Sequence, residues 1–315
     1  MRIAITGGSG FIGGTLAHTL LAQGHELVLL ARGTRTTTVR THQNVRVVAS
    51  DLSDVQVLLN AFSECEAVAH CAGINREIGN QTYQRVHVQG TRNVIEAATK
   101  AGVRKILLMS FLRACPGCGS AYHESKWQAE EVVRNARLDY TIFKAGMVYG
   151  RGDHLLDHLS HAFYTLPLLP TVGLREKRIR PLAIQDLVRI MAAALSDGRF
   201  SRKTIAITGA EELYLSDAAR RVARVLGKKI VVFAAPLWFQ YLTAQFFEWT
   251  MKIPLAAKAQ VRILSEGVVE PALPCDSVPE DLAPILKFTE QQIRFGLPEP
   301  GPFTVQDLRC CFNHA

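Results

Sequence analysis

The sequence contains no low-complexity tract and no long run of charges of one sign, which argues against a disordered tail or a fibrous repeat. Its seven cysteines are odd in number and irregularly spaced, so they do not form the disulfide framework of a small secreted protein. No basic segment followed by an apolar one precedes the first predicted strand. We therefore expect that the thiols are reduced, that there is no secretory signal and that the protein is cytoplasmic. A location at the surface of a membrane is the alternative.

Motifs typical of nucleic-acid binding are also absent. The chain carries 36 Lys and Arg against 28 Asp and Glu, a net charge of +8, which suits an anionic cofactor, an anionic lipid surface or nucleic acid. The basic residues are scattered, and there is no helix-turn-helix, zinc-finger or aromatic-basic RNA-binding signature. Nucleic acid is the least favoured partner, and we predict none.

Short β-branched runs alternate with segments of helical periodicity through the first half of the chain. Strands are predicted at 2–6, 25–31, 45–49, 67–70, 105–110 and 140–144, and helices at 11–22, 54–62, 82–101 and 120–137. Several strands are almost entirely apolar, which indicates a parallel sheet covered on both faces. We predict an α/β fold: a Rossmann doubly wound sheet in 1–150 and a smaller α/β lobe in 151–315, interleaved with the first domain.

A glycine-rich turn lies between the first predicted strand and helix. Gly7 allows a sharp turn, Gly10 lets the backbone approach a diphosphate, and Gly13 permits close packing of helix on strand. The helix N-terminus adds N–H groups and a positive dipole end. A glycine pattern alone is weak evidence, but a strand before it and a helix after it are the required context. The predicted contacts with a dinucleotide here are Gly7, Gly8, Ser9, Gly10, Phe11, Ile12 and Gly13.

The end of the second predicted strand indicates which dinucleotide binds. An NAD enzyme carries Asp or Glu there, whereas this chain reads Leu-Ala-Arg-Gly-Thr-Arg from residue 30 to 35. The guanidinium of Arg32, helped by Thr34 and Arg35, is suited to a 2′-phosphate. We therefore predict NADP, with NAD as the alternative. A solvated arginine on a loop is the non-functional interpretation.

Two further strand ends are placed to meet the cofactor. Asp51 and Leu52 follow the third strand, where the adenine edge is expected. The fourth strand ends beside the cofactor in His70, Cys71, Ala72 and Gly73. These predictions rest on position in the sheet.

A tyrosine and a lysine stand four residues apart at the start of the helix after the fifth strand. Tyr122 and Lys126 therefore point the same way. A neighbouring ammonium favours the phenolate and should lower the pKa of the phenol toward the range of a general acid or base. Ser110 closes the fifth strand, where it could orient a substrate oxygen.

With these motifs the whole chain resembles an extended or atypical short-chain dehydrogenase/reductase. The resemblance implies Asp51 at the adenine, Tyr122 as proton donor or acceptor, and Lys126 on the ribose and the tyrosine. Met109-Ser110, Ser120-Ala121-Tyr122-His123 and the late Pro236-Leu237-Trp238 are similar to the branch that contains the dehydrogenase-like accessory subunit of respiratory complex I and its bacterial relatives.

The chain departs from the family pattern at two positions near the cofactor. His87 stands where the extended enzymes usually have asparagine, and the segment that begins at Lys144 lacks the usual proline near the nicotinamide. We keep His87 and Lys144 among the predicted cofactor contacts. Relatives in this branch can hold the cofactor as a structural element, so the resemblance implies cofactor binding but does not require turnover.

Two other features are interpreted more plainly. Cys115 and Cys118 have the spacing of a thiol redox motif, but they lie in a predicted loop before a helix and not at the start of a thioredoxin-type fold, so we predict no redox chemistry. A zinc site would need two further ligands, and the candidates Cys310, Cys311 and His314 lie far away in sequence, so we predict no metal site. Residues 231–247 carry no charge but fall short of the roughly 20 residues of a membrane-spanning helix. A buried helix pair is the favoured interpretation and an interfacial helix the alternative.

Three functions follow from the sequence. The first is an NADP-dependent oxidoreductase that uses the tyrosine and lysine on a small-molecule substrate. The second is a non-catalytic cofactor-binding accessory protein of a respiratory or quinone-associated assembly that docks through 231–265. The third, a nucleotide-sugar epimerase or dehydratase, is disfavoured by Arg32. Neither the substrate nor the oligomeric state follows from the sequence.

Overall fold

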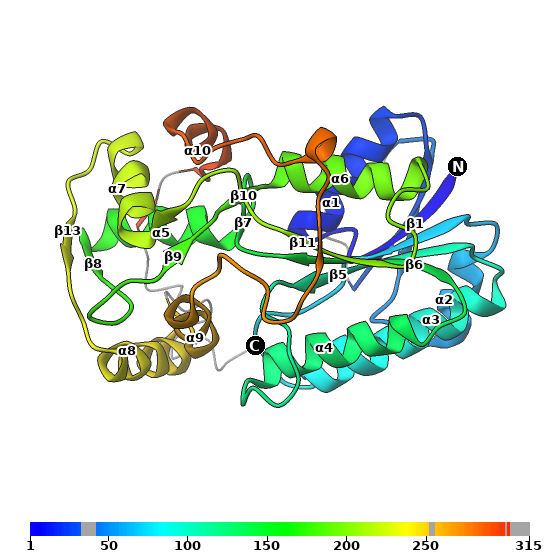
Figure 1. Cartoon of the computed structure of the whole chain (residues 1–315), viewed down its shortest axis with the longest axis horizontal. Coiled ribbons are helices and arrows are strands. Elements are labelled where there is room, and N and C mark those ends of the chain that lie inside the picture. The colour runs from blue at the N-terminus through cyan, green and yellow to red at the C-terminus, as the bar shows by residue number, and fades with distance from the viewer. Residues whose placement is uncertain (33–41, 252–255, 300, 303–315) are drawn as a thin grey trace, which may run out of the picture. The chain divides into compact units, whose positions relative to one another are not determined.

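The computed structural model describes residues 1–32, 42–251, 256–299 and 301–302 (Figure 1). The chain divides into two compact units, between which it passes several times. Unit 1 contains residues 1–145, 184–207 and 271–284, and unit 2 contains residues 146–183, 208–270 and 285–315.

Unit 1 is built on a parallel sheet of eight strands in the order β14-β11-β6-β5-β4-β1-β2-β3. The strands are β1 (Arg2–Thr6), β2 (Glu26–Ala31), β3 (Val45–Ala49), β4 (Ala67–His70), β5 (Lys105–Phe111), β6 (Asp139–Ala145), β11 (Lys203–Ile207) and β14 (Asp276–Ser277). The order reverses between β1 and β4, so a crevice for a ligand is expected at the carboxyl ends of these two strands. The predicted Rossmann fold is confirmed.

Helices cover both faces of this sheet (Figure 1). On one face α1 (Phe11–Ala22) packs against α6 (Ile184–Ser196), and on the other lie α2 (Val55–Phe62), α3 (Gly90–Lys100) and α4 (Ala121–Arg134). The apolar core between the sheet and this second set of helices includes Val28, Leu58 and Ile106. The helix predicted over 82–101 is in fact a π-helical segment, Gln84–Gln89, that runs into α3. Such segments occur often at functional sites.

Unit 2 has its own core, formed by α5 (His154–Thr165), α7 (Leu215–Val225) and α10 (Glu290–Gly296). Tyr149 and Phe288 pack edge to face in it, 4.7 Å between ring centroids. Three two-stranded pairings complete the unit: β7 (Val148–Tyr149) with β10 (Leu182–Ala183), β9 (Arg178–Ile179) with β12 (Leu213–Tyr214), and β8 (Leu168–Pro170) with β13 (Val231–Phe233). Two further helices are α8 (Leu237–Thr250) and α9 (Lys258–Glu266).

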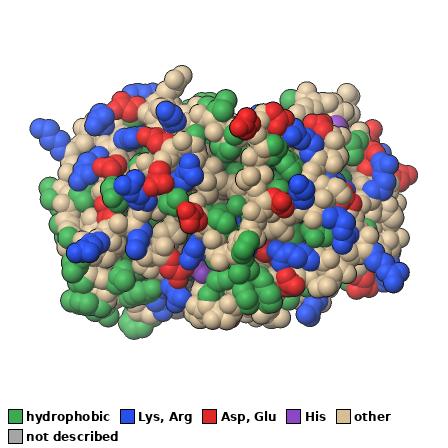
Figure 2. Space-filling view, viewed as in Figure 1, with side chains coloured by type: hydrophobic (Ala, Val, Ile, Leu, Met, Phe, Trp, Pro, Cys, Tyr) green, Lys and Arg blue, Asp and Glu red, His purple; other side chains and the backbone are tan. Residues whose placement is uncertain are grey.

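The uncharged stretch 231–247 forms β13 and most of α8, and the buried helix pair predicted for it is wrong. Helix α8 buries only Gln240 and Ala244. Its outer face gathers apolar side chains that Figure 2 shows at the lower left: Trp238, Leu242, Phe246 and Trp249, each 60% exposed or more. The lack of charge reflects an apolar surface rather than a core. No helix in the described ranges has both the length and the apolarity to cross a bilayer.

Candidate dinucleotide site and active site

The glycine turn between β1 and α1 allows no side chain at two of its glycines. Gly7 has φ +69°, and a Cβ there would lie 2.8 Å from the Ala72 backbone nitrogen. A Cβ on Gly13 would lie 2.4 Å from the Gly7 carbonyl oxygen. The Gly10 N–H closes the turn by donating to that same oxygen at 2.9 Å. The turn therefore packs against the end of β4 with backbone alone.

The start of α1 is open to an anion. Its N-cap is Gly10, which has no side chain to cap the first N–H groups, and the first turn contains no acidic residue. Gly10 and the preceding Ser9 are exposed, while Phe11 and Ile12 are half-buried. The sequence thus leaves these donors and the positive end of the helix dipole to a ligand, and a diphosphate fits them.

The buried His70, at the end of β4, joins β1, β4 and α3 through hydrogen bonds to two threonines. Nδ1 of His70 lies 2.6 Å from Thr6 Oγ1, and its Nε2 lies 3.0 Å from Thr91 Oγ1. Because the Thr91 hydroxyl donates to the His87 carbonyl, it accepts from His70, whose proton is therefore on Nε2. Burial, with Lys126 nearby, lowers the pKa of His70 to about 3. This ring stays neutral and fixes the two strand ends.

The residues after β4 are held against the end of β1 by backbone hydrogen bonds to Thr6. The Cys71 N–H donates to the Thr6 carbonyl at 3.1 Å, and the Ala72 N–H reaches Thr6 Oγ1 at 3.4 Å. Burial raises the pKa of the Cys71 thiol to about 12, so it is not a thiolate. A Cβ on Gly73 would lie 3.1 Å from Lys126 Nζ. The predicted contacts after β4 therefore lie between the glycine turn and the lysine.

The predicted adenosine contacts lie on the β2 and β3 side. The exposed Arg32 donates from Nη1 to Gln81 Oε1 at 2.8 Å, whereas Thr34 and Arg35 fall outside the described residues. Asp51 forms an ion pair with Arg85, 3.2 Å between Oδ2 and Nη2, and its carboxyl pKa is lowered chiefly by hydrogen bonds from Ser53. The buried Leu52 takes φ +70°.

Tyr122 and Lys126 are placed by the first turn of α4, which Ser120 caps by accepting from the His123 N–H at 3.4 Å. The half-buried phenol ring lies among other rings, with centroids 5.5 Å from Phe111, 5.6 Å from Tyr83 and 5.8 Å from His87. Nζ of Lys126 donates to the Met109 carbonyl at 3.3 Å. Lys126 also lines, with His70, His87 and Ser110, a small cavity that is too narrow to admit a water molecule.

The predicted effect of Lys126 on the phenol is wrong. Burial is the main cause that raises the pKa of Tyr122 above its usual value, and Tyr83 adds to it. Burial also lowers the pKa of Lys126 to about 8. The ammonium is directed at the Met109 carbonyl and not at the phenol, so it does not favour the phenolate. Tyr122 is therefore protonated at neutral pH, as a proton donor must be.

His87 positions the tyrosine through a chain of hydrogen bonds. Its Nε2 accepts from the Ile74 N–H at 3.1 Å, so the proton of the neutral ring is on Nδ1, which lies 2.9 Å from Ser125 Oγ. The Ser125 hydroxyl in turn donates to the Tyr122 carbonyl at 2.9 Å. Burial is the largest cause that lowers the pKa of His87, to about 2. Both ring nitrogens are thus engaged by the protein, and His87 holds the first turn of α4.

Two predicted residues belong to a buried ionic network instead. The Ser110 hydroxyl donates to Glu130 Oε1 at 2.5 Å, and Nζ of Lys144 donates to the Ala114 carbonyl at 2.8 Å and lies 3.2 Å from Glu130. Arg134 completes the network at 2.7 Å from the fully buried Glu130 carboxylate. The structure therefore brings Ser110 to the edge of the cavity but ties its hydroxyl to Glu130, which the sequence analysis missed.

The comparisons with known proteins agree with this geometry. Residues 7–154 match a family model described as NAD(P)H-binding. This part of the chain is therefore similar to NAD(P)H-binding domains, and its sheet has the strand order of a Rossmann fold. The match begins at the first glycine of the turn and includes Tyr122 and Lys126.

Curated relatives are similar at low identity. An uncharacterised protein of Mycobacterium tuberculosis is 26% identical over 237 residues, which cover 75% of this chain but only 24% of that protein. The photosystem II assembly factor Ycf39 of Synechocystis is 25% identical over 258 residues, 79% of this chain and 76% of the factor. A 3 beta-hydroxysteroid dehydrogenase of M. tuberculosis is 26% identical over 262 residues, 72% of this chain and 70% of the enzyme.

Solved structures share the fold. The UDP-glucuronic acid 4-epimerase of Bacillus cereus superposes with a TM-score of 0.68 at 17% identity, over 94% of this chain and 98% of the epimerase. Identity at this level shows that the two proteins share a fold and says nothing about the substrate.

Proposed function

We propose that the protein is an NADP-dependent oxidoreductase that reduces a carbonyl group of a small molecule. The observation that carries the proposal is the position of Tyr122 and Lys126 in the first turns of α4, at the carboxyl ends of the same strands as the glycine turn between β1 and α1. The raised pKa of the Tyr122 phenol supports a role as proton donor. The name of the M. tuberculosis dehydrogenase, a relative over 72% of the chain, supports this reaction class.

Each residue has a stated task in this reaction. When bound, the nicotinamide supplies a hydride to the carbonyl carbon. Tyr122 donates its proton to the carbonyl oxygen and regains one from solvent, so the net change is one hydride and one proton added to the substrate. Lys126, whose pKa is lowered to about 8, carries a positive charge at neutral pH and is assigned to the ribose of the cofactor, as the family resemblance implies. His87 and Ser125 hold the turn that carries the phenol.

The experiment that tests the proposal is a screen of carbonyl compounds with the full chain and NADPH, read from the loss of reduced-nicotinamide absorbance. The proposal requires a carbonyl substrate whose reduction depends on Tyr122. If the screen finds turnover that is unchanged in Tyr122→Phe, the role given to the tyrosine is wrong.

Arg32 is proposed to select NADPH over NADH. We expect Arg32→Ala to weaken NADPH binding roughly 10- to 100-fold, because a hydrogen bond between charged groups is lost, and to leave NADH binding unchanged. Arg46→Ala removes another exposed cation of the same sheet, on β3, and is the matched control, for which both affinities should stay constant. Equal losses for the two cofactors in Arg32→Ala would contradict the assignment.

A second candidate function is a cofactor-binding accessory protein that docks on a membrane surface, as part of a respiratory or quinone-associated assembly. It is favoured by the apolar face of α8, whose members recur every three or four residues and are exposed: Trp238, Leu242, Phe246 and Trp249. Exposed Lys228 and Lys229, just before β13, suit anionic headgroups. Ycf39, a relative over most of its length, is named an assembly factor.

Vesicle binding tests this second function. The full chain should co-sediment with vesicles of anionic phospholipid, and the double variant Trp238→Ser/Trp249→Ser should bind at least ~10-fold more weakly, because each buried aromatic side chain contributes about 1.5–3 kcal/mol. Phe295→Ser, which removes an equally exposed aromatic residue from α10, is the control and should bind as the wild type does. If the wild-type chain does not co-sediment with the vesicles, this second function is wrong.

A further inference from the structure

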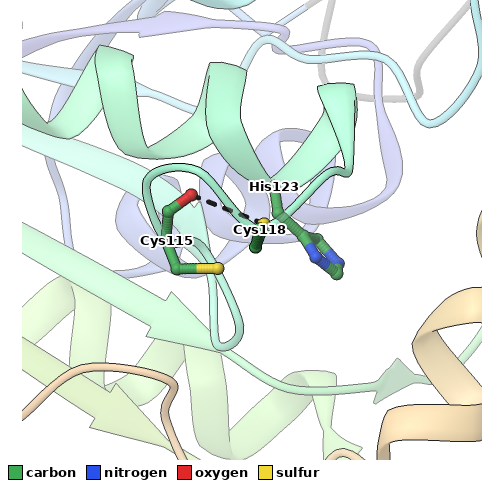
Figure 3. Close-up of side chains that lie close together, drawn as sticks. All are labelled: Cys115, Cys118 and His123. Carbon is green, nitrogen blue, oxygen red and sulfur yellow. Dashed lines mark hydrogen bonds between the residues drawn. The ribbon is translucent and has the colours of Figure 1, made fainter.

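A cluster of soft ligands lies beside the first turn of α4, in unit 1. Cys115 and Cys118 are on the loop between β5 and α4, and His123 is in the first turn of the helix. Their two sulfurs and one ring nitrogen all lie within 4.8 Å of one another. Figure 3 shows the three side chains side by side, with Cys118 Sγ 3.6 Å from the Cys115 carbonyl oxygen.

Two glycines with positive φ shape the loop that carries Cys115 and Cys118. Gly117 takes φ +58° and Gly119 takes φ +71°, a region that disfavours side chains, and a Cβ at either would meet open space, so the backbone alone requires glycine. This tight turn carries the Cys-x-x-Cys spacing found in zinc sites. Both cysteines are half-buried, which leaves the cluster within reach of an ion from solvent.

The third ligand is held by the fold. The His123 side chain is 1% exposed, and its ring stacks on Phe111 with centroids 5.1 Å apart and planes 18° apart. Its backbone N–H is capped by Ser120. A histidine five residues after Cys118 is not at a spacing that the sequence analysis considered, because its proximity depends on how the loop turns into the helix.

We propose that Cys115, Cys118 and His123 form a binding site for Zn²⁺. Two thiolates and one imidazole are a known zinc ligand set, with a fourth position left for water or another ligand. Around a tetrahedral ion the ligand atoms stand roughly 3.8 Å apart at metal–ligand distances of about 2.0–2.3 Å, so the cluster must close by about 1 Å at most. Two thiolates also neutralise the charge of the ion.

The site touches the proposed catalytic residue. Tyr122 precedes His123, and their rings lie 5.8 Å apart. An ion that joins the loop to the first turn of α4 would hold this turn and with it the phenol. Zinc binding itself does not depend on the proposed function, because it is measured without substrate or nicotinamide cofactor.

The test uses the reduced full chain with Zn²⁺ alone, and Co²⁺ as a spectroscopic probe. We expect one equivalent of Zn²⁺ per chain, a higher unfolding temperature with zinc, and a thiolate-to-cobalt charge-transfer band with intense visible bands of tetrahedral Co²⁺. Cys118→Ser and His123→Gln should each lower zinc affinity by more than the roughly 10- to 100-fold that loss of an outer-sphere partner costs.

Matched controls separate this cluster from other ligands of the chain. Cys275→Ser removes a half-buried cysteine elsewhere in unit 1, and Cys310→Ser/Cys311→Ser removes the pair outside the described residues; both should bind zinc as the wild type does. Circular dichroism verifies that each variant is folded. The proposal would be overturned if the reduced wild-type chain takes up no zinc, even where it forms a Cys115–Cys118 disulfide on oxidation. It would also be overturned if Cys118→Ser binds zinc as tightly as the wild type does.

Discussion

Tyr122→Phe is expected to lower turnover by roughly 100- to 10,000-fold while NADPH affinity stays within about twofold of the wild type. The substitution removes the only group at the carboxyl ends of the sheet to which a proton-donating role has been assigned. The half-buried ring and its contacts with Phe111, Tyr83 and His87 remain. The loss should therefore appear in kcat and not in cofactor binding.

Tyr140→Phe is the matched control for this experiment. Tyr140 lies on β6, where its ring carries the Arg202 guanidinium 4.9 Å from its centroid, and it has no part in the proposed site. It loses the same hydroxyl and should keep full activity. Equal activity of the two variants would show that the phenol of Tyr122 does not transfer the proton.

Gly13→Ala is expected to lower affinity for either nicotinamide cofactor by roughly 100-fold or more. The added Cβ would stand 2.4 Å from the Gly7 carbonyl oxygen, so the turn must shift. A shift that breaks two backbone hydrogen bonds to a charged diphosphate costs about 3 kcal/mol of binding free energy or more, at about 1.5–3 kcal/mol each. Titration calorimetry with NADPH and NADH measures the loss.

The neighbouring glycine supplies the control. A Cβ on Gly14 would lie 3.5 Å from the Gly8 carbonyl oxygen, an ordinary contact, so Gly14→Ala should keep cofactor affinity and gain about 0.5–1 kcal/mol of stability as a helical alanine. Thermal unfolding of both variants separates lost binding from lost fold. Unchanged affinity in a folded Gly13→Ala protein would mean that the diphosphate does not bind at this turn.

Local patterns predict most of unit 1 well. The β-branched run Arg2–Thr6, the glycines after it and the periodicity of Phe11–Ala22 each specify structure over a few residues, and the elements found agree with them. The same holds for the apolar strand β5 and for α4, whose start is capped by Ser120. Such signals are strong because the backbone itself requires particular residues there.

The errors come from effects that depend on tertiary contacts. The apolar stretch at α8 is consistent with either a core or a surface, and only the placement of Gln240, which donates to the Thr171 carbonyl at 2.9 Å, shows which face is inside. The pKa of Tyr122 depends on burial and on the neighbouring Tyr83, while the Lys126 ammonium donates to the Met109 carbonyl. Spacing along a helix carries neither piece of information.

The network around His70 is equally non-local. Thr6, His70 and Thr91 come from three different elements, and no motif links them. Glu130, which holds both Ser110 and Lys144, gave no signal beyond a carboxylate on an amphipathic helix. The cofactor and catalytic roles assigned from the sequence stay predictions, and the geometry shows which of these residues have polar atoms available to a ligand.

Titration of the purified full chain with NADPH and NADH tests the central claim most directly. If the amides at the start of α1 hold a diphosphate, calorimetry should show one saturable site per chain for NADPH and a weaker one for NADH. A chain with the circular dichroism of a folded α/β protein that gives no binding signal with either cofactor would contradict the account.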